Sequence, residues 1–256
     1  MGVEHRGLRA ALKGALSLLY PPQCIGCGEP VAAGTGNGGD LCPECWRDMQ
    51  FIIGCACSRC GVPLPDDGIE TPDEALLCDD CLRTDPPWRQ GRAAFVYSGT
   101  GRKLVLALKH GDRPDLAPHL AGWLTQAARP LIRQDMIVAP VPLHMRRLLK
   151  RRYNQAGLLS RHLAVSAGLE HAPNLLIRKR NTNPQDRRSV TERFANQQDA
   201  MIVNPRLGDL SRGRAVLLID DVMTSGATLS ACAEALQEAG SGPISVAVLA
   251  RAAKDD

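Results

Sequence analysis

The sequence predicts an α/β domain with a mainly parallel sheet, preceded by a small cysteine-rich unit. Nine of the ten cysteines fall between Cys24 and Cys81, whereas the residues after Pro87 supply short apolar runs that alternate with helical patterns. Such alternation is typical of a parallel sheet with helices packed on it. A chain of 256 residues is long enough for one ordinary domain with its own core and one small unit.

The first segment, residues 1–22, is expected to form an amphipathic helix. Apolar residues recur at helical spacing over residues 8–20, and two prolines end the pattern. The apolar stretch carries Lys13, lacks a clear cleavage site and is too short to span a bilayer. We therefore expect no secretory signal, no membrane span and a cytoplasmic protein. Docking of the helix on the protein itself or on a membrane surface both remain open.

The cysteine-rich unit is expected over residues 23–88 and contains four Cys-x-x-Cys pairs. Two residues between thiolates let one tight turn direct both sulfurs at one metal ion, and a glycine after the first pair of each half permits a close backbone path. The two halves repeat, with 14 residues between the pairs in the first half and 17 in the second. We predict a double zinc ribbon whose two zinc ions are held by Cys24, Cys27, Cys42 and Cys45 and by Cys57, Cys60, Cys78 and Cys81.

Other interpretations of these cysteines compete with zinc ligation. Without an export signal, reduced metal ligands are favoured over disulfides. A redox dithiol and an iron–sulfur cluster remain alternatives. Closed sites with four cysteines leave no open coordination position, so the zinc is expected to be structural. Cys55 could exchange with Cys57, which we favour as the ligand, and Cys232 is expected to be a small core residue.

The second domain is expected over residues 89–256. Ligands of parallel α/β sheets bind beyond the carboxyl ends of the strands, so the order of elements locates a candidate site. Strands are expected at residues 93–97, 136–141, 215–219 and 244–249, and helices at residues 102–109, 116–128, 155–167 and 228–239.

Residues 216–228 are the most informative segment of this domain. A buried-strand run is followed by two acidic residues and by a loop of small residues that opens a helix. The start of a helix favours an anion, and threonine and serine hydroxyls add donors. The carboxylates of Asp220 and Asp221 would repel a phosphate but accept hydrogen bonds from vicinal ribose hydroxyls. The segment is predicted to hold a ribose 5-phosphate, with the phosphate on Thr224, Ser225, Gly226, Ala227 and Thr228.

Three alternatives compete with this interpretation. The strand and acidic pair imitate part of a P-loop nucleotide site, but the chain has no G-x-x-x-x-G-K-[ST] motif. The acidic pair also occurs in phospho-acceptor domains, which the following small residues do not suit. A plain strand, turn and capped helix remains the third alternative.

Residues 216–228 resemble, without a gap, the phosphoribosyl pyrophosphate (PRPP) motif of type I phosphoribosyltransferases. The whole chain resembles the ComF/GntX family, a double zinc ribbon followed by a type I phosphoribosyltransferase-like domain. Residues 141–143, 151–155 and 178–193 take part in this resemblance. It implies a parallel sheet with helices on both faces, binding of PRPP or a nucleoside 5′-monophosphate, and transfer of a phosphoribosyl group with release of pyrophosphate.

The resemblance also implies roles for particular residues. Asp220 and Asp221 are the expected catalytic residues, and Mg²⁺ is the expected partner of the departing pyrophosphate. The pyrophosphate loop is expected at Leu143 and His144. A mobile loop is expected at residues 178–193, where Arg178 and Gln185 reach the pyrophosphate or the nucleophile. The polar, basic and proline-interrupted composition of that loop agrees, with an ordinary solvated loop as the alternative.

A second class of function is a non-catalytic or sensor accessory in competence-related DNA uptake or processing. Its zinc ribbons would be a docking surface for single-stranded DNA or DNA-uptake proteins. The basic cluster at residues 146–152 fits pyrophosphate, nucleic acid or a solvated face. The net charge of +4 is mild, and an aromatic content of 4% disfavours a stacking platform for single-stranded DNA.

Overall fold

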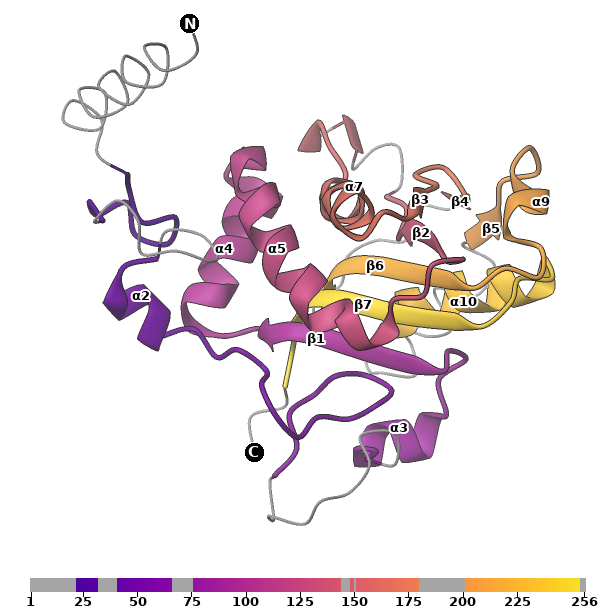
Figure 1. Cartoon of the computed structure of the whole chain (residues 1–256), viewed down its shortest axis with the longest axis horizontal. Helices are drawn as coiled ribbons and strands as arrows, with labels where there is room; N and C mark the ends of the chain where they lie inside the picture. The colour runs from indigo at the N-terminus through magenta and orange to yellow at the C-terminus, as the bar shows by residue number, and fades with distance from the viewer. Residues whose placement is uncertain are drawn as a thin grey trace, which may run out of the picture.

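The computed structural model of the chain describes residues 22–31, 41–65, 76–143, 148–149, 151–179 and 201–253. The helix expected over residues 8–20 lies outside these described residues. Figure 1 shows a central sheet with helices around it and the cysteine-rich segment wrapped about one end.

A parallel sheet with the strand order β1-β7-β6-β2-β3 forms the centre of the molecule (Figure 1). All eight residues of β7 and the first four of β6 are buried. Near-continuous runs of valine, leucine and isoleucine explain this, because strands covered on both faces have no polar side. The strands are β1 (Gln90–Val96), β2 (Ile137–Pro140), β3 (Glu170–His171), β6 (Val216–Met223) and β7 (Ile244–Arg251).

Helices cover both faces of this sheet, as the sequence predicts. Leu217 and Ile219 of β6 belong to one core cluster, together with α4 (Gly99–His110), α5 (Ala117–Ala128) and α7 (Gln155–Ala167). The alternate residues Val216 and Leu218 belong to a second cluster with α10 (Ala227–Glu238). Because successive strand residues point to opposite faces, the two clusters are the two sides of one sheet. The predicted fold class is confirmed.

The four expected strands and four expected helices are all found, α7 with its predicted ends and the others with shifted ends. The largest shift concerns β6, which pairs with β7 as far as Met223, opposite Arg251. Asp220 and Asp221 therefore lie within a strand and not after it, because pairing with the long neighbouring strand keeps their backbone extended. The remaining short elements are η1 (Pro114–Leu116), η2 (Arg129–Leu131), α9 (Gly208–Ser211) and the antiparallel pair β4 (Leu176–Arg178) and β5 (Met201–Val203).

The two halves of the cysteine-rich unit pack against opposite faces of the sheet. The first half, with α2 (Pro43–Arg47), contributes Cys24 and Met49 to the cluster that contains α4 and α5. The second half, with α3 (Asp79–Thr84), contributes Cys57 and Cys60 to the cluster that contains α10. The unit thus shares both cores of the α/β domain. The predicted boundary at residues 88 and 89 stays a prediction.

Candidate functional site

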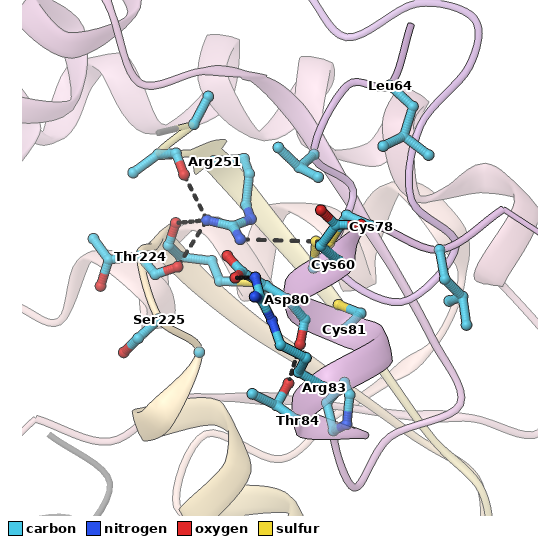
Figure 2. Close-up of a pocket in the computed structure, with 18 of the residues that line it drawn as sticks. Cys60, Leu64, Cys78, Asp80, Cys81, Arg83, Thr84, Thr224, Ser225 and Arg251 are labelled. Carbon is cyan, nitrogen blue, oxygen red and sulfur yellow. Dashed lines mark hydrogen bonds and ion pairs between the residues drawn. The ribbon is translucent and has the colours of Figure 1, made fainter. Parts of the chain in front are cut away.

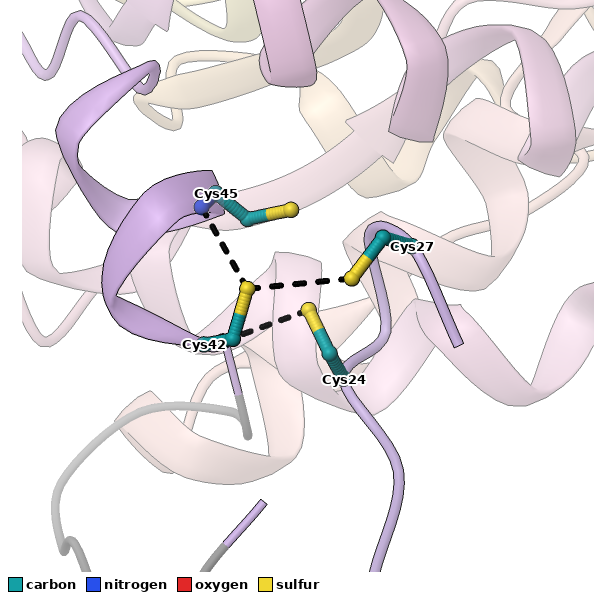
Figure 3. Close-up of side chains that lie close together, drawn as sticks. All are labelled: Cys24, Cys27, Cys42 and Cys45. Atoms are coloured by element: carbon teal, nitrogen blue, oxygen red, sulfur yellow. Dashed lines mark hydrogen bonds between the residues drawn. The ribbon is translucent and has the colours of Figure 1, made fainter. Parts of the chain in front are cut away.

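Eight cysteines form two groups of four, with the pairing that the sequence predicts. In each group the sulfur atoms all lie within 4.8 Å of one another, and all ten cysteines are free thiols. The distance from Cys27 Sγ to Cys42 Sγ is 3.7 Å (Figure 3), and that from Cys60 Sγ to Cys78 Sγ is 3.6 Å. Tetrahedral zinc with bonds of about 2.3 Å separates its sulfurs by about 3.8 Å. Both groups therefore fit a structural zinc ion.

The two clusters differ in exposure. Cys27 of the first cluster is exposed. In the second cluster, Cys57 is 0% and Cys60 3% exposed. Cys55 is not part of either cluster, which agrees with the preference for Cys57 as the ligand. Cys232 is fully buried in α10, as expected for a core residue.

The carboxyl ends of β2 and β6 lie side by side, and the connections that follow them lead to opposite faces of the sheet. Both strands run parallel, and Val141 N donates to Ile219 O at 2.9 Å. From β2 the chain continues to α7 on one face, whereas from β6 it continues to α10 on the other. A crevice outside such a switch point is the usual ligand position of parallel α/β sheets. Leu143, in the segment after β2, and the loop after β6 share this edge.

Residues 224–228, which connect β6 to α10 and include the first two residues of that helix, are called the phosphate loop here. Gly226 is the N-cap of α10 with φ of 78°, a left-handed conformation that favours glycine. The first N–H groups of a helix have no partner within it, so they are available to an anion. A cavity of about 110 Å³ lies against this loop. Its lining comprises Asp220, Val222, Met223, Thr224, Ser225, Gly226, Ala227, Thr228 and Leu229.

Two residues that the sequence analysis missed define one side of this loop. A Cβ added at Gly226 would lie 3.2 Å from the Trp88 ring, so Trp88 packs directly behind the turn. Arg251 Nη1 donates to Met223 O at 3.1 Å and to Thr224 O at 2.7 Å. A trans peptide places its N–H opposite its C=O. The N–H groups of Thr224 and Ser225 are therefore turned away from Arg251.

The two acidic residues of β6 have different partners. Asp221 is buried, and its Oδ1 lies 2.9 Å from Nζ of Lys109 in the last turn of α4. Asp220 lies on the α10 side. Burial raises the pKa of the Cys232 thiol there, and the charge of Asp220 raises it further. Burial and the nearby Asp221 charge raise the pKa of Asp220 to about 7. The pair thus offers one carboxylate already matched by a cation and one that takes up a proton near neutral pH.

The remaining predicted site residues are only partly described. His144 and Gln185 lie outside the described residues, together with the rest of the expected mobile loop from residue 180 to 193. Arg178 is described and is the last residue of β4, because Leu176–Arg178 pairs with Met201–Val203. This corrects its expected place in a loop. Burial and the Asp221 charge raise the pKa of Asp220, and the positive charge of Arg178 acts to lower it.

The basic cluster is described at Arg151 and Arg152, and both side chains have partners. Arg152 Nη1 lies 3.1 Å from Asp112 Oδ2, and Arg151 Nη1 donates to Gln155 Oε1 at 3.3 Å. Separately, none of the helices within the described ranges has the length and apolar character needed to cross a membrane.

Comparison with known proteins matches both parts of the chain. A model described as "Double zinc ribbon domain" matches residues 15–84, and one described as "Phosphoribosyl transferase domain" matches residues 155–256.

Relatives align with most of the chain. The DNA utilization protein YhgH of Salmonella typhimurium is 29% identical over 91% of this chain and 99% of its own length. Competence protein F of Haemophilus influenzae is 29% identical over 90% of this chain and 97% of its own. Competence protein ComFC of Bacillus subtilis is 26% identical over 78% of this chain and 79% of its own. The two-part organisation is thus shared along nearly the whole chain.

Proposed function

Because the chain belongs to the ComF family, which joins a double zinc ribbon to a phosphoribosyltransferase-like domain, we propose that it binds PRPP or a nucleoside 5′-monophosphate. We propose further that it transfers the phosphoribosyl group to an acceptor with release of pyrophosphate. The observation that carries the proposal is the phosphate loop, which opens α10 at the β2/β6 switch point beside a cavity of about 110 Å³.

The loop supplies the anchor for the 5′-phosphate. Backbone N–H groups at the start of α10 and the hydroxyls of Thr224, Ser225 and Thr228 line or open onto the cavity. Binding energy from a phosphate that does not react helps to orient C1′ of the ribose. The acidic residues Asp220 and Asp221, further back along β6, are the proposed partners of the ribose hydroxyls.

In the proposed reaction a nucleophile of the acceptor, an amine or a base nitrogen, forms a bond to C1′. The bond from C1′ to the pyrophosphate oxygen breaks, its electron pair leaves with pyrophosphate, and the acceptor loses a proton to solvent. The negative charge of Asp221 favours the positive charge that develops on the ribose ring, while Lys109 holds that carboxylate in place at 2.9 Å.

Mg²⁺ is proposed as the partner of the pyrophosphate group. It is a hard cation that prefers oxygen ligands, and Asp220 and Asp221 supply carboxylate oxygens at this edge. Bound there, the ion neutralises negative charge on the leaving group. Leu143, at the adjacent end of β2, belongs to the proposed pyrophosphate loop, and Arg178 is a proposed cation on the α10 side.

Calorimetric titration with PRPP and with AMP, each with Mg²⁺, tests the binding part. Thr228→Ala removes one donor to the phosphate and should weaken binding roughly tenfold. Thr125→Ala is the matched control, because Thr125 is a helical threonine whose hydroxyl bonds only to Ala121 O at 2.7 Å. Failure of both compounds to bind the unaltered protein at millimolar concentration would refute the proposal.

A second candidate function is a nucleotide-responsive accessory in DNA uptake or processing that binds the ligand without turning it over. The relatives named for competence and DNA utilisation favour it. Here the second zinc ribbon, next to the phosphate loop, would carry the docking surface.

Release of pyrophosphate across a panel of amine and base acceptors separates the two functions. A transferase releases pyrophosphate with at least one acceptor, and Asp221→Asn lowers the rate far more than it lowers affinity. An accessory binds PRPP or AMP, releases no pyrophosphate with any acceptor, and binds single-stranded DNA with an affinity that falls steeply with salt.

A further inference from the structure

Arg251 is a buried cation at the carboxyl end of β7. Arg251 is 7% exposed. Among the residues that the structure describes, no carboxylate forms an ion pair with it. An unpaired buried charge is strongly unfavourable, so Arg251 needs a counter-charge from another source.

The second cysteine cluster lies next to this cation. Arg251 Nη2 donates toward Cys60 Sγ at 3.8 Å, and Figure 2 shows the guanidinium between the cluster and the phosphate loop. A zinc ion with four thiolates carries two net negative charges. The metal-loaded second cluster is therefore the counter-ion that the described residues otherwise lack.

The other nitrogen of the same guanidinium holds the phosphate loop. Nη1 donates to three carbonyl oxygens, those of Met223 at 3.1 Å, Thr224 at 2.7 Å and Ala252 at 2.6 Å. Nε has no hydrogen-bond partner among the described residues. The planar fork of arginine makes these contacts at once, which a lysine ammonium on a flexible stem does not reproduce.

The first cluster has no such link to the loop. Its cysteines pack on the α4 and α5 face, and within the described part of the chain the hydrogen bonds to their sulfurs come from one another and from backbone N–H groups of the same half, such as that of Glu29. A cavity of about 810 Å³, by contrast, is lined both by Cys60, Cys78 and Cys81 and by Thr224, Ser225 and Gly226. Only the second cluster shares a wall with the phosphate loop among the described residues.

We propose that Arg251 is a positioning residue that couples zinc in the second cluster to the conformation of the phosphate loop. The thiolate cluster holds the guanidinium, the guanidinium holds the carbonyls of residues 223 and 224, and the amides of the same peptides are thereby turned toward the ligand side. Metal occupancy of the second cluster then sets the affinity of the loop for a phosphate group. The inference deepens the proposed function and rests on it for the identity of the ligand.

Hydrogen–deuterium exchange of the full-length, zinc-loaded protein tests the coupling without any ligand. Arg251→Met should accelerate exchange in peptides that cover residues 223–230 by roughly tenfold, because carbonyl bonds that hold the loop are lost. Arg251→Lys should restore the exchange rate only in part. Arg212→Met is the matched control, since the Arg212 side chain is 73% exposed and its ion-pair partner among the described residues is Asp209. Peptides that cover β2 report whether each variant is folded.

Substitution of one cysteine ligand in each cluster distinguishes the effects of the two metal sites. Cys27→Ser, in the first cluster, should leave exchange of residues 223–230 unchanged, whereas Cys78→Ser, in the second, should accelerate it as Arg251→Met does. Titration with PRPP and Mg²⁺ should then show roughly tenfold weaker binding for Arg251→Met and Cys78→Ser alone.

Each outcome decides one of the two proposals. Loop exchange that is unchanged in Arg251→Met, or equally fast in Cys27→Ser and Cys78→Ser, overturns the coupling even where PRPP binds. Coupled exchange in a protein that binds neither PRPP nor AMP leaves the coupling standing and refutes the proposed function. Where the cysteine variants fail to fold, as shown by the β2 peptides, the two Arg251 variants alone decide.

Discussion

The two halves of the cysteine-rich unit repeat the same pattern in sequence, yet they lie in different surroundings. The first cluster has an exposed member, Cys27, and packs on the face covered by α4 and α5. The second has buried members, Cys57 and Cys60, and packs on the face covered by α10, beside the phosphate loop. The two cysteine clusters thus lie on opposite sides of one sheet, and only the second lies next to the candidate site within the described residues.

The attachment of each half explains the difference further. The first half is joined to the domain by aromatic side chains, with Phe51 at 5.2 Å from Trp123 and 6.3 Å from Phe95 between ring centroids. Hydrogen bonds also join both halves to the domain, from Thr100 Oγ1 to Asp48 Oδ2 at 2.7 Å for the first half and from Gly91 N to Ser58 O at 2.7 Å for the second. Within the described residues only the second half contacts Arg251, through Cys60 Sγ. Through Arg251 the hydrogen bonds of the second half extend to the carbonyl oxygens of Met223 and Thr224.

The largest expected effect comes from removing a ligand of the second cluster. Cys57→Ser should lower the free energy of unfolding by on the order of 5 kcal/mol, because zinc binding supplies about 10 kcal/mol per structural site. Cys27→Ser should cost about half as much, since water can replace a ligand that is exposed. Urea denaturation, together with zinc analysis before and after, measures both.

Chelation should likewise destabilise the α/β domain, because cysteines of both clusters are part of its two cores. Zinc-free protein whose α/β domain melts at the same temperature as the loaded protein would contradict this view and favour two independent units. Equal losses in Cys57→Ser and Cys27→Ser would remove the distinction between the halves.

The next effect tests the aromatic anchor of the first half. Phe51→Ala should lower the free energy of unfolding by about 3 kcal/mol, the usual cost of deleting a packed aromatic side chain. Affinity for PRPP should stay unchanged under conditions where the variant is folded, since Phe51 contacts the face opposite the phosphate loop. Denaturation and calorimetry give the two numbers. A parallel loss of affinity would show that the halves are not separate in function.

The sequence was most informative where chemistry is local. The Cys-x-x-Cys spacing predicted both metal clusters, and the helical pattern over residues 155–167 predicted α7 with its observed ends. Asn154 precedes this helix and Gly168 follows it with φ of 66°, as is typical of helix ends. The phosphate loop was likewise predicted from a run of thirteen neighbouring residues, 216–228.

The parts that sequence reasoning missed depend on contacts between distant segments. Lys109 reaches Asp221 across more than a hundred residues, and Arg251 reaches Cys60 across 191 positions. No local pattern encodes such pairs. A weak signal existed at Arg251, because a single cation at the end of a long buried strand requires a partner. The end of β6 was misplaced because strand length follows from the neighbouring strand.

A smaller effect is expected at Gly226, in the turn between β6 and α10. Gly226→Ala places a Cβ at φ of 78° and 3.2 Å from the Trp88 ring. Strain of this kind costs about 1–2 kcal/mol, so the free energy of unfolding should fall by that amount and PRPP affinity about tenfold. Gly168→Ala is the control, since Gly168 also has positive φ but nothing lies within 4 Å of its Cβ position. Loss of affinity in both variants would point to general destabilisation.

The smallest expected effect distinguishes the two faces of the sheet by their acidic residues. Burial and Asp221 raise the pKa of Asp220 from 3.8 to about 7 in the folded protein. The folded state therefore binds a proton that the unfolded state has released between about pH 4 and 7, and stability falls as the pH rises through this window. The full slope for one such group is about 1.4 kcal/mol per pH unit. Because Asp220 is partly exposed and shares its shift with Asp221, we expect about 1 kcal/mol between pH 5 and 7. Asp220→Asn should remove this loss and become more stable than the unaltered protein at pH 8.

Asp115 lies in η1, on the sheet face where the first half packs, and its pKa is shifted in the opposite direction to that of Asp220. Its hydrogen bonds with Arg113 lower its pKa, so its contribution is present at neutral pH and is lost only as the pH falls through the lowered value. Asp115→Asn should thus shift stability equally at pH 5, 6, 7 and 8, because the residue is charged throughout. Urea denaturation at these four pH values measures both variants. A flat difference for Asp220→Asn would show that its carboxylate is charged at neutral pH, like Asp115, and that the α10 face carries no proton near the phosphate loop.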